Sequence, residues 1–276
     1  MSITKERITE LEKICNDLRI DLIKMLHDKQ TGHPGGSLSV CEILVTLMYE
    51  KAKLDPTNPA WEERDRIIMT KGHAAPMQYL ILGKLGFFPE EEFASFRQIN
   101  SILQGHPCMN STPGIELTSG PLGIGLPAAV GVACSLKLDK NDSYVYAILG
   151  DGELNEGAVW EAMMSASKFK TDNLICILDN NGVQLDGTRD EIMPLDNLRE
   201  RFESFGMKVF EADGHDIADL CDKIDEAKTV KDQPVMIMAN TVKGKGVSFM
   251  EGKSAWHGNP IGDDFYEQAL KELGGK

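Results

Sequence analysis

From residue 144 onward the sequence alternates apolar, strand-like runs with amphipathic, helix-like segments. The predicted strands are 144–149, 174–179, 207–212 and 235–242, and the helices between them are about 157–169, 195–205 and 216–228. Continuous apolar strands separated by helices are typical of a parallel sheet that is covered by helices on both faces. We therefore predict an α/β fold, and we expect ligands to bind beyond the carboxyl ends of its strands.

The part of the chain before residue 144 is predicted to be mostly helical. Apolar residues recur at helical spacing within 4–28, and further helices are predicted over 40–50 and 123–138. The segment 67–70 is a short apolar stretch, and 99–121 is rich in Gly, Pro and Ser and is predicted to be irregular.

Two of these helices have candidate capping residues at their starts. Ser37 or Ser39 could cap the helix over 40–50, and Asp213 or Asp216 the helix over 216–228. Neither repeats nor flexible linkers divide the sequence, so we expect residues 1–276 to form one domain with a helical N-terminal part.

Composition limits the partners and the cellular location of the chain. A net charge of −14 argues against nucleic acid or an anionic membrane surface as a partner. The charged N-terminus has no signal-peptide core, and no apolar run approaches the roughly 20 residues that a membrane span needs. The six cysteines are scattered, with Cys134 and Cys176 in apolar runs, so we expect core thiols in a reducing cytoplasm and no structural zinc.

The turn 150-GDGELNEG-157 follows a predicted strand and carries three carboxylates. A glycine-bearing turn before a helix usually binds phosphate, which carboxylates would repel. A divalent cation held by Asp151 would resolve this conflict, because Mg²⁺ is typically bound by one or two carboxylates together with substrate phosphates. Asn180 and Asn181, after the next strand, could add neutral oxygens. Either segment alone is more often an ordinary turn, but together they favour a metal–diphosphate site.

Five of the six histidines adjoin a glycine, which is a composition typical of loops that line ligands. His27 is the exception, and its place near a helix C-terminus suggests a structural role. His215 is expected to serve a turn and a helix cap. The remaining four could line one pocket and bind a hydroxylated substrate as neutral donors and acceptors: His33, His73, His106 and His257.

The glycine-rich segment 119-SGPLGIG-125 is a weaker signal, because small residues allow a ligand to approach the backbone but specify no ligand. The dinucleotide fingerprint G-x-G-x-x-G is absent from the start of any predicted helix, which disfavours a nicotinamide or flavin enzyme.

With these motifs in this order, the chain resembles the diphosphate-binding half of transketolases, which are thiamin-diphosphate enzymes. The resemblance extends from about residue 10 to 262 and rests on the following motifs: 32-GHPGGSL-38, 65-DRIIMTKGHA-74, 96-FRQ-98, 105-GHP-107, 119-SGPLGIG-125, 150-GDGELNEG-157, 179-DNNGVQLDG-187, 243-KGKG-246 and 256-WHG-258. The GDG and NN pair alone would also suit related 2-oxo-acid dehydrogenases, and the glycine-flanked histidines point to transketolase. The resemblance implies a thiamin-diphosphate-binding fold.

For the cofactor, the resemblance implies three metal ligands, which would bind Mg²⁺ or Ca²⁺: Asp151, Asn181 and the carbonyl of Val183. It implies that the diphosphate contacts Gly152, His73, Lys243 and His257. The aminopyrimidine and thiazolium rings would lie against Gly120 and Leu122. Glu153 is counted with the cofactor-binding residues, through its backbone rather than its charge.

For catalysis, the resemblance implies that His33, His106 and His257 line the substrate channel, and that these histidines together with His73 assist the reaction. Glu156 corresponds to a carboxylate buried between two cofactor-binding domains. The implied reaction is the transfer of a two-carbon ketol unit from a ketose phosphate to an aldose phosphate, as in the pentose phosphate pathway.

Length is the main departure from the family, because a full transketolase continues into a pyrimidine-binding domain with the glutamate that activates the cofactor. No acidic residue of this chain can be assigned that role, and we expect the chain to be complete at Lys276. We therefore expect the N-terminal subunit of a split transketolase, active in a heterotetramer with a separate C-terminal subunit. Two alternatives are a split enzyme for an unusual sugar, such as a sulfonated or branched one, and a non-catalytic homologue.

Overall fold

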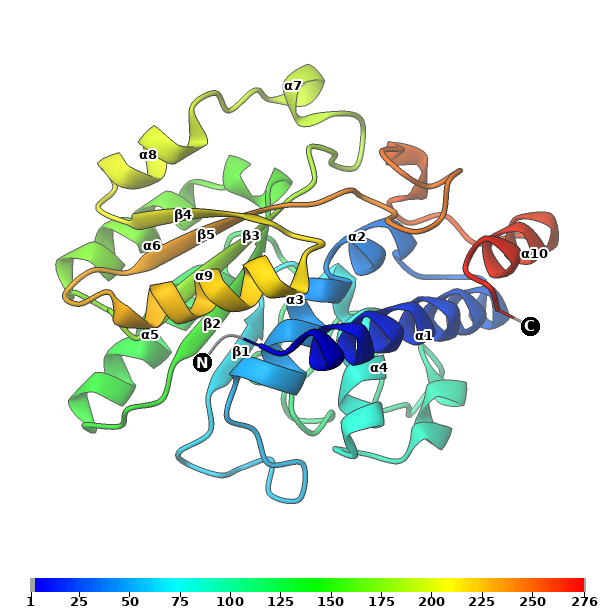
Figure 1. Ribbon diagram of the computed structural model, residues 1–276, viewed down its shortest axis with the longest axis horizontal. Coiled ribbons are helices and arrows are strands. Elements are labelled where there is room, and N and C mark those ends of the chain that lie inside the picture. Colours follow the sequence, from blue (N-terminus) through cyan, green and yellow to red (C-terminus); the bar gives the residue numbers. More distant parts are fainter. Residues whose placement is uncertain (1–2, 276) are drawn as a thin grey trace.

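A computed structural model describes residues 3–275, and its centre is a five-stranded parallel sheet (Figure 1). The strand order is β1-β2-β3-β5-β4. The strands are β1 (Arg66–Met69), β2 (Val145–Gly150), β3 (Leu174–Asn180), β4 (Lys208–Asp213) and β5 (Val235–Asn240). The predicted α/β fold is therefore confirmed. The sequence pattern missed β1 as a strand, because four residues are too few to show a period, yet β1 pairs with β2 along its whole length.

The helices were mostly predicted at the right places, with ends that differ by a few residues. They are α1 (Lys5–Lys29), α2 (Pro34–Ser39), α3 (Cys41–Thr46), α4 (Ala75–Leu85), α5 (Gly125–Leu138), α6 (Gly157–Lys168), α7 (Arg189–Ile192), α8 (Leu198–Ser204), α9 (Ile217–Thr229) and α10 (Asp263–Glu272). Shorter helical turns are η1 (Leu47–Lys51), η2 (Gly72–Ala74), η3 (Glu90–Ser95), η4 (Gly152–Asn155) and η5 (Ser254–Trp256).

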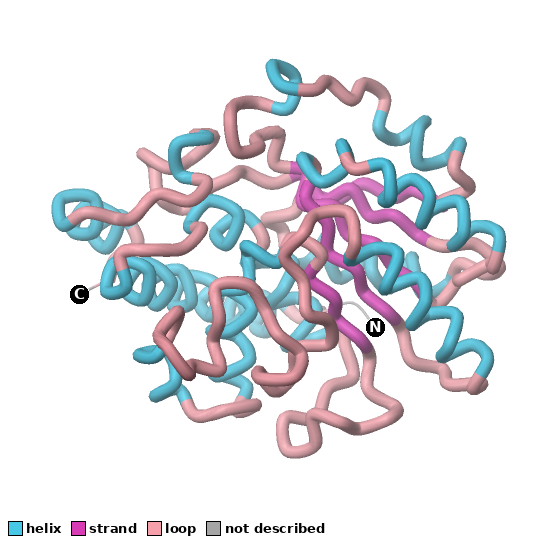
Figure 2. The backbone as a smooth tube through the Cα atoms, turned by 180° about the vertical axis from the view of Figure 1, so that it is seen from behind, coloured by secondary structure: helices cyan, strands magenta, loops and turns pink. Residues whose placement is uncertain are grey.

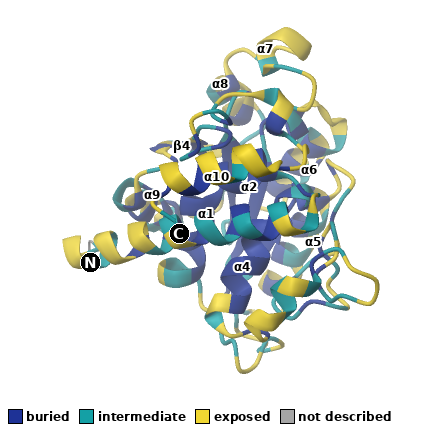
Figure 3. Cartoon of the chain, turned by 90° about the vertical axis from the view of Figure 1, so that its right-hand side faces the viewer, coloured by how far each residue is buried: buried dark blue, intermediate teal, exposed yellow. Residues whose placement is uncertain are grey.

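Alternate residues of each strand point to opposite faces of the sheet and form two cores. On β2, Tyr146 and Ile148 pack with α1, α3, α4 and α9, whereas Val145, Ala147 and Leu149 pack with α5, α6 and α8. Figure 3 shows the buried residues gathered between these elements, with α7 exposed at the outside. The N-terminal helices share a core with the sheet, and the division of the chain into domains stays a prediction.

The predicted cap of the helix over 40–50 is wrong. Helical structure begins earlier, at Pro34, so that His33 is the N-cap residue and Ser37 and Ser39 lie inside α2. The Ser39 hydroxyl turns inward and donates to Asp179 at 2.6 Å. By contrast, Asp216 caps α9 as predicted, since its Oδ1 accepts from the backbone N–H of Ala218 and Asp219 at 2.8 and 3.1 Å.

The loops also follow the prediction closely. Residues 96–124 contain neither helix nor strand, and Figure 2 shows in pink how much of the chain beside the sheet is irregular.

All six cysteines are free, with Cys176 fully buried in β3 but Cys134 only half-buried on α5, contrary to expectation. Within residues 3–275 no helix is both long and apolar enough to cross a membrane.

Candidate active site

A cavity of about 180 Å³ lies at the carboxyl ends of β2 and β3, where the fold predicted a ligand site. Gly150 and Asp179 are paired in the parallel register, so the segments that follow the two strands leave the sheet side by side. Nine of the predicted site residues line the cavity: His73, Leu122, Asp151, Gly152, Glu153, Asn181, Val183, Lys243 and His257. The other four lie around it or beyond it.

Asp151 is the first residue after β2, and only 2% of its surface is exposed. Its Oδ1 accepts from the N–H of Gly152 at 3.0 Å and its Oδ2 from the N–H of Gly182 at 2.6 Å. Burial and the charge of Asp179 raise the pKa of Asp151 to about 6, although the Arg189 guanidinium lies 3.7 Å away. The positive charge near Asp151 is thus too small to balance the negative charge of its carboxylate.

Asn181 and Val183 lie on the turn that faces Asp151. The amide of Asn181 accepts from the N–H of Val183 at 3.1 Å and donates to Asp179 at 3.2 Å. The Val183 carbonyl accepts from Lys243 Nζ at 2.9 Å. Asn180, the other expected oxygen donor, points elsewhere, because its amide pairs with Asn240 and Arg189. Asn180 is thus not among the residues that line the cavity.

The predicted metal ligands fit a hard divalent cation. Across residues 3–275 no three His, Cys, Asp or Glu side chains form a metal-binding group, so a cation here would depend on one carboxylate and neutral oxygens. Asp151, the Asn181 amide and the Val183 carbonyl supply those ligand types, and Mg²⁺ with phosphates uses few protein ligands. A cation would also offset the burial that raises the pKa of Asp151.

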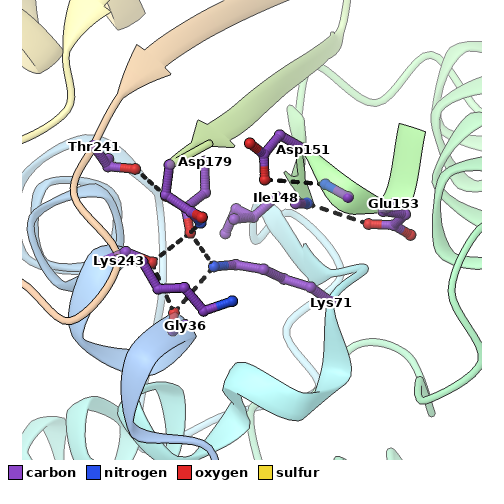
Figure 4. A network of polar contacts seen from close by, with 12 residues as sticks. Gly36, Lys71, Ile148, Asp151, Glu153, Asp179, Thr241 and Lys243 are labelled. Carbon is purple, nitrogen blue, oxygen red and sulfur yellow. Dashed lines mark hydrogen bonds and ion pairs between the residues drawn. The ribbon is translucent and has the colours of Figure 1, made fainter. Parts of the chain in front are cut away.

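Beneath the cavity, Lys71 and Asp179 form a fully buried ion pair (Figure 4). The Lys71 ammonium also donates to the Gly36 carbonyl at 3.1 Å, and Asp179 accepts from the hydroxyls of Ser39 and Thr241. Burial alone would raise the pKa of Asp179, but Lys71 and the two hydroxyls outweigh it and hold that pKa below its usual value. With Asp151, Asn181 and Val183, this pair forms what we call the cavity floor.

Glu153 lines the cavity as expected, and its side chain has a structural role that the sequence did not reveal. Its side chain is buried, and its two carboxylate oxygens accept from the Thr70 hydroxyl at 2.5 Å and from the N–H of Gly123 at 3.0 Å and of Gly150 at 3.3 Å. Burial raises the pKa of Glu153, and these donors offset the effect only in part. The carboxylate therefore fastens the glycine-rich loop to the ends of β1 and β2.

The four predicted histidines do gather beside the cavity, and we call them the histidine wall: His33, His73, His106 and His257. Ring centroids are 5.3 Å apart for His33 and His73, 5.6 Å for His33 and His257, 5.0 Å for His73 and His257, and 6.0 Å for His33 and His106. Burial lowers the pKa of every one of them, and neighbouring cations add to the effect, so that the pKa reaches about 4 for His33 and about 3 for His257. The wall is neutral at physiological pH.

Lys243 joins the cavity floor to the wall. Its buried Nζ lies 2.9 Å from His257 Nδ1 and 2.9 Å from the Val183 carbonyl oxygen. Burial and the charge of Lys71 lower the pKa of Lys243 to about 8. Lys243 is therefore a buried residue of the site and not a solvated loop lysine.

The remaining predicted residues lie near the mouth of the cavity. Gly120 is next to His106, since a Cβ there would lie 3.6 Å from the imidazole ring. Leu122 lines the cavity and is 37% exposed, and its neighbour Ile124 is 59% exposed. Glu156 is exposed at the start of α6, next to Gly123.

The two histidines outside the wall have structural partners. His27 is stacked on Tyr266 at 3.9 Å and lies 2.9 Å from Asp263, in agreement with its expected structural role. His215 is not a helix cap. Its Nδ1 lies 2.9 Å from Glu42, and its Nε2 accepts from the N–H of Val242 at 2.8 Å, which fixes the segment before Lys243.

Sequence reasoning missed several side chains of the site, chiefly Lys71, Arg97, Asp179 and Leu185. Two of them could have been found from the sequence, because Lys71 and Asp179 each end an apolar run. A charged residue at the end of a buried strand is rarely buried without an oppositely charged partner. Neither residue carries a signal that identifies the other.

Comparisons with known proteins agree with this geometry. Residues 11–276 match the family described as transketolase, thiamine diphosphate binding domain. In Clostridium sp., the subunit of a 6-deoxy-6-sulfo-D-fructose transketolase is 39% identical over 97% of this chain and 98% of its own length. In Actinobacillus succinogenes, one of the subunits of an apulose-4-phosphate transketolase is 40% identical over 96% of both chains. The crystal structure of a Campylobacter jejuni transketolase gives a TM-score of 0.91 and 33% identity, with 98% of this chain and 43% of that one covered.

The chain therefore belongs to the transketolase family of enzymes, and it corresponds to the thiamin-diphosphate-binding part. It matches two separate subunits over nearly their whole length, and it corresponds to less than half of the larger Campylobacter jejuni chain. The two relatives that it matches over nearly their whole length are named as transketolase subunits.

Proposed function

We propose that this subunit binds thiamin diphosphate through a divalent cation at the cavity floor and transfers a two-carbon ketol unit only together with a separate C-terminal subunit. One observation carries the proposal. A charge-deficient carboxylate with amide and carbonyl oxygens beside it lines one cavity together with the neutral His73 and His257, and His33 and His106 lie next to these two histidines.

At the cavity floor, Asp151, the Asn181 amide and the Val183 carbonyl hold the cation, and Gly152 allows the diphosphate to approach the backbone. Lys243 adds a positive charge that is already buried and needs no further desolvation. His73 and His257 donate to phosphate oxygens as neutral imidazoles. When bound, thiamin diphosphate supplies the carbanion chemistry, and the protein supplies orientation and electrostatics.

At the wall, His33, His106 and His257 bind the hydroxyls of the sugar and orient it. Because burial lowers the pKa of all three, they offer uncharged donors and acceptors and do not compete with Lys243 for the diphosphate charge. Gly120 and Leu122 present backbone and apolar surface to the cofactor rings.

The partner subunit supplies what the chain lacks. We propose a heterotetramer in which the glutamate that activates the cofactor comes from the C-terminal subunit. The rim of the cavity suits such an interface, because Leu122, Ile124 and Leu185 expose 37%, 59% and 61% of their surface, and Glu156 lies next to the loop that carries Leu122 and Ile124. Apolar side chains grouped in this way are typical of a surface that another chain covers.

A second candidate concerns the sugar. Both separate subunits compared above are named for substrates other than common pentose phosphates, a sulfonated fructose and apulose 4-phosphate. We therefore propose an unusual ketose as the alternative donor. A non-catalytic role has less support, because every predicted ligand and histidine is retained at the cavity or beside it.

The test mixes this chain with the product of the adjacent reading frame, thiamin diphosphate and Mg²⁺, and measures ketose–aldose exchange with pentose, hexose, sulfonated and branched sugars. Turnover with one donor class selects between the two candidates, and turnover with none would contradict both.

In the same complex, Asp151→Ala should abolish Mg²⁺-dependent cofactor binding, measured by calorimetry. Glu161→Ala, an exposed carboxylate on α6, is the matched control and should leave the cofactor affinity unchanged. An unchanged affinity in Asp151→Ala would exclude Asp151 as a metal ligand.

A further inference from the structure

Arg97 connects two of the loops that carry the histidine wall. Its Nη1 donates to the Thr31 hydroxyl at 2.7 Å, and its Nη2 lies 3.4 Å from the Gly105 carbonyl oxygen and 3.4 Å from His33 Nδ1. Thr31 comes two residues before His33, and Gly105 comes directly before His106. One side chain of the irregular segment thus contacts both loops.

The backbone of Arg97 and the glycine at position 105 allow the guanidinium to lie close to the loop that carries His106. Arg97 itself has a left-handed backbone, with φ of +59°, which is uncommon for a residue other than glycine. A Cβ at Gly105 would lie 2.9 Å from Arg97 Nε, so only glycine lets the guanidinium approach this loop.

The charge of Arg97 is not compensated by an acid. Among the described residues it forms no ion pair, and its hydrogen-bond partners are a hydroxyl, a carbonyl and an imidazole. A half-buried cation without a counter-ion costs free energy that a neutral side chain would avoid. Its position is therefore hard to explain by stability alone.

The chemistry of the contact fixes the proton of His33. A guanidinium has five N–H donors and no acceptor, so Nδ1 of His33 must be the acceptor in this pair. A neutral imidazole that accepts at Nδ1 carries its hydrogen on Nε2. That edge of the ring faces Gly258, where a Cβ would lie 3.5 Å from Nε2, next to His257.

We propose that Arg97 is a positioning residue that holds His33 as the neutral Nε2–H tautomer, so that His33 donates a hydrogen bond to a hydroxyl or carbonyl oxygen of the sugar. This inference rests on the proposed function for the identity of the acceptor, but the tautomer itself is a property of the free subunit. Burial and Arg97 together lower the pKa of both His33 and His106, which keeps the donor uncharged.

The direct test is nitrogen NMR of the full-length subunit with labelled histidines at pH 7.5, with the His33 signals assigned through His33→Gln. In the native chain, His33 should show one set of signals with a protonated Nε2 and an accepting Nδ1. Arg97→Met should give a mixture of both tautomers. Arg97→Lys keeps N–H donors without an acceptor and should restore the native tautomer.

Arg199→Met is the matched control, because Arg199 pairs with Glu203 and Glu211 on the surface and is far from the wall in sequence and fold. It should leave the His33 signals unchanged. Should Arg97→Met fail to fold, Thr31→Val and Arg97→Lys still test the pair, since Thr31→Val removes a neighbour of the guanidinium but keeps the donor to His33. A protonated Nδ1 in the native chain, or a single Nε2–H tautomer in Arg97→Met, would overturn the proposal.

Kinetic measurements on the complex with the C-terminal subunit distinguish a role of Arg97 in orienting His33 from a general disruption of the active site. Arg97→Met should raise KM for the donor sugar about tenfold, the effect of one poorly directed hydrogen bond, while kcat and the cofactor Kd change less than about twofold. A fall in kcat with unchanged KM would contradict the role. If the native complex turns over no sugar but the tautomer responds as expected, the proposed function fails and the inference about Arg97 stands.

Discussion

The two sides of the cavity are built in different ways. The cavity floor stands on the ends of adjacent strands and contains buried charges, with Lys71, Asp151 and Asp179 within hydrogen-bonding reach of fixed partners. The histidine wall comes from separate loops and is neutral, although cations lie beside it. The buried ion pair lies at the ends of the strands, where both of its partners are fixed in place, whereas the wall consists of neutral side chains that need no counter-charge.

The largest expected effect tests the charges of the cavity floor. Asp179→Ala leaves the Lys71 ammonium buried without its partner, and removing one partner of a buried ion pair typically costs about 3–5 kcal/mol. We expect that loss in the free energy of unfolding of the isolated subunit, measured with urea.

The matched control replaces both charges. The double variant Lys71→Met and Asp179→Leu should recover most of the stability, because no unpaired charge remains. If the single variant is as stable as the native chain, water or a rearranged side chain must stabilise the Lys71 charge. The cavity floor would then not depend on paired charges, and its contrast with the neutral wall would disappear.

A smaller effect is expected at Glu153, which joins the cavity floor to the glycine-rich loop. Glu153→Ala leaves the N–H groups of Gly123 and Gly150 without their acceptor, and such a loss costs about 1–3 kcal/mol. Glu153→Gln should cost less, since it can still accept from Gly123, and the Thr70 hydroxyl can donate to Ile148 instead. Equal losses of unfolding free energy in the two variants would show that the charge, not the bonding, is what matters.

The same contrast explains which parts could be predicted from the sequence. Strand periodicity and the parallel-sheet rule were enough to place Asp151 beside Asn181, because neighbouring strand ends must meet. The four histidines were grouped correctly only by their glycine neighbours and the family resemblance. Arg97 could not be assigned, since its contacts depend on the path of residues 96–124, which has no period to read.

The hydrogen-bond partners of individual side chains could not be predicted from the sequence either. His215 was expected at a helix cap, but it reaches Glu42, which lies 173 positions away in the chain. The hydrogen bonds of the buried Glu153 carboxylate could not be predicted, because the resemblance carries a motif and not the direction of a side chain. A sequence gives the order of such residues, whereas their partners are set by how the elements pack.

The next prediction concerns acid and the wall. The pKa of His33 is lowered to about 4, below the value near 6.5 expected for an unfolded chain. Between these two values the unfolded chain binds more protons, so the stability rises with pH across this window and is lost as the pH falls from about 6.5 to about 4. His33→Gln should lose less stability in this window, by about 1 kcal/mol or less after allowance for solvent screening.

The comparison variant for the acid experiment is His27→Gln, because His27 lies on α1 outside the wall and is paired with Asp263. Its acid loss should be no smaller than that of the native chain. Urea unfolding at several pH values measures both variants. An identical pH dependence in His33→Gln and the native chain would show that folding does not lower the pKa of His33.

The smallest effect on the isolated chain is expected at the rim of the cavity. Leu185→Ser changes a side chain that is 61% exposed, so the free energy of unfolding should change by less than about 0.5 kcal/mol. The same change should weaken assembly with the C-terminal subunit, measured by analytical ultracentrifugation, if the rim is the surface that the partner covers. Leu138→Ser is the matched control, because Leu138 is 83% exposed at the end of α5. Equal assembly of both variants would place the partner elsewhere, and the floor and wall would then form a site closed by this chain alone.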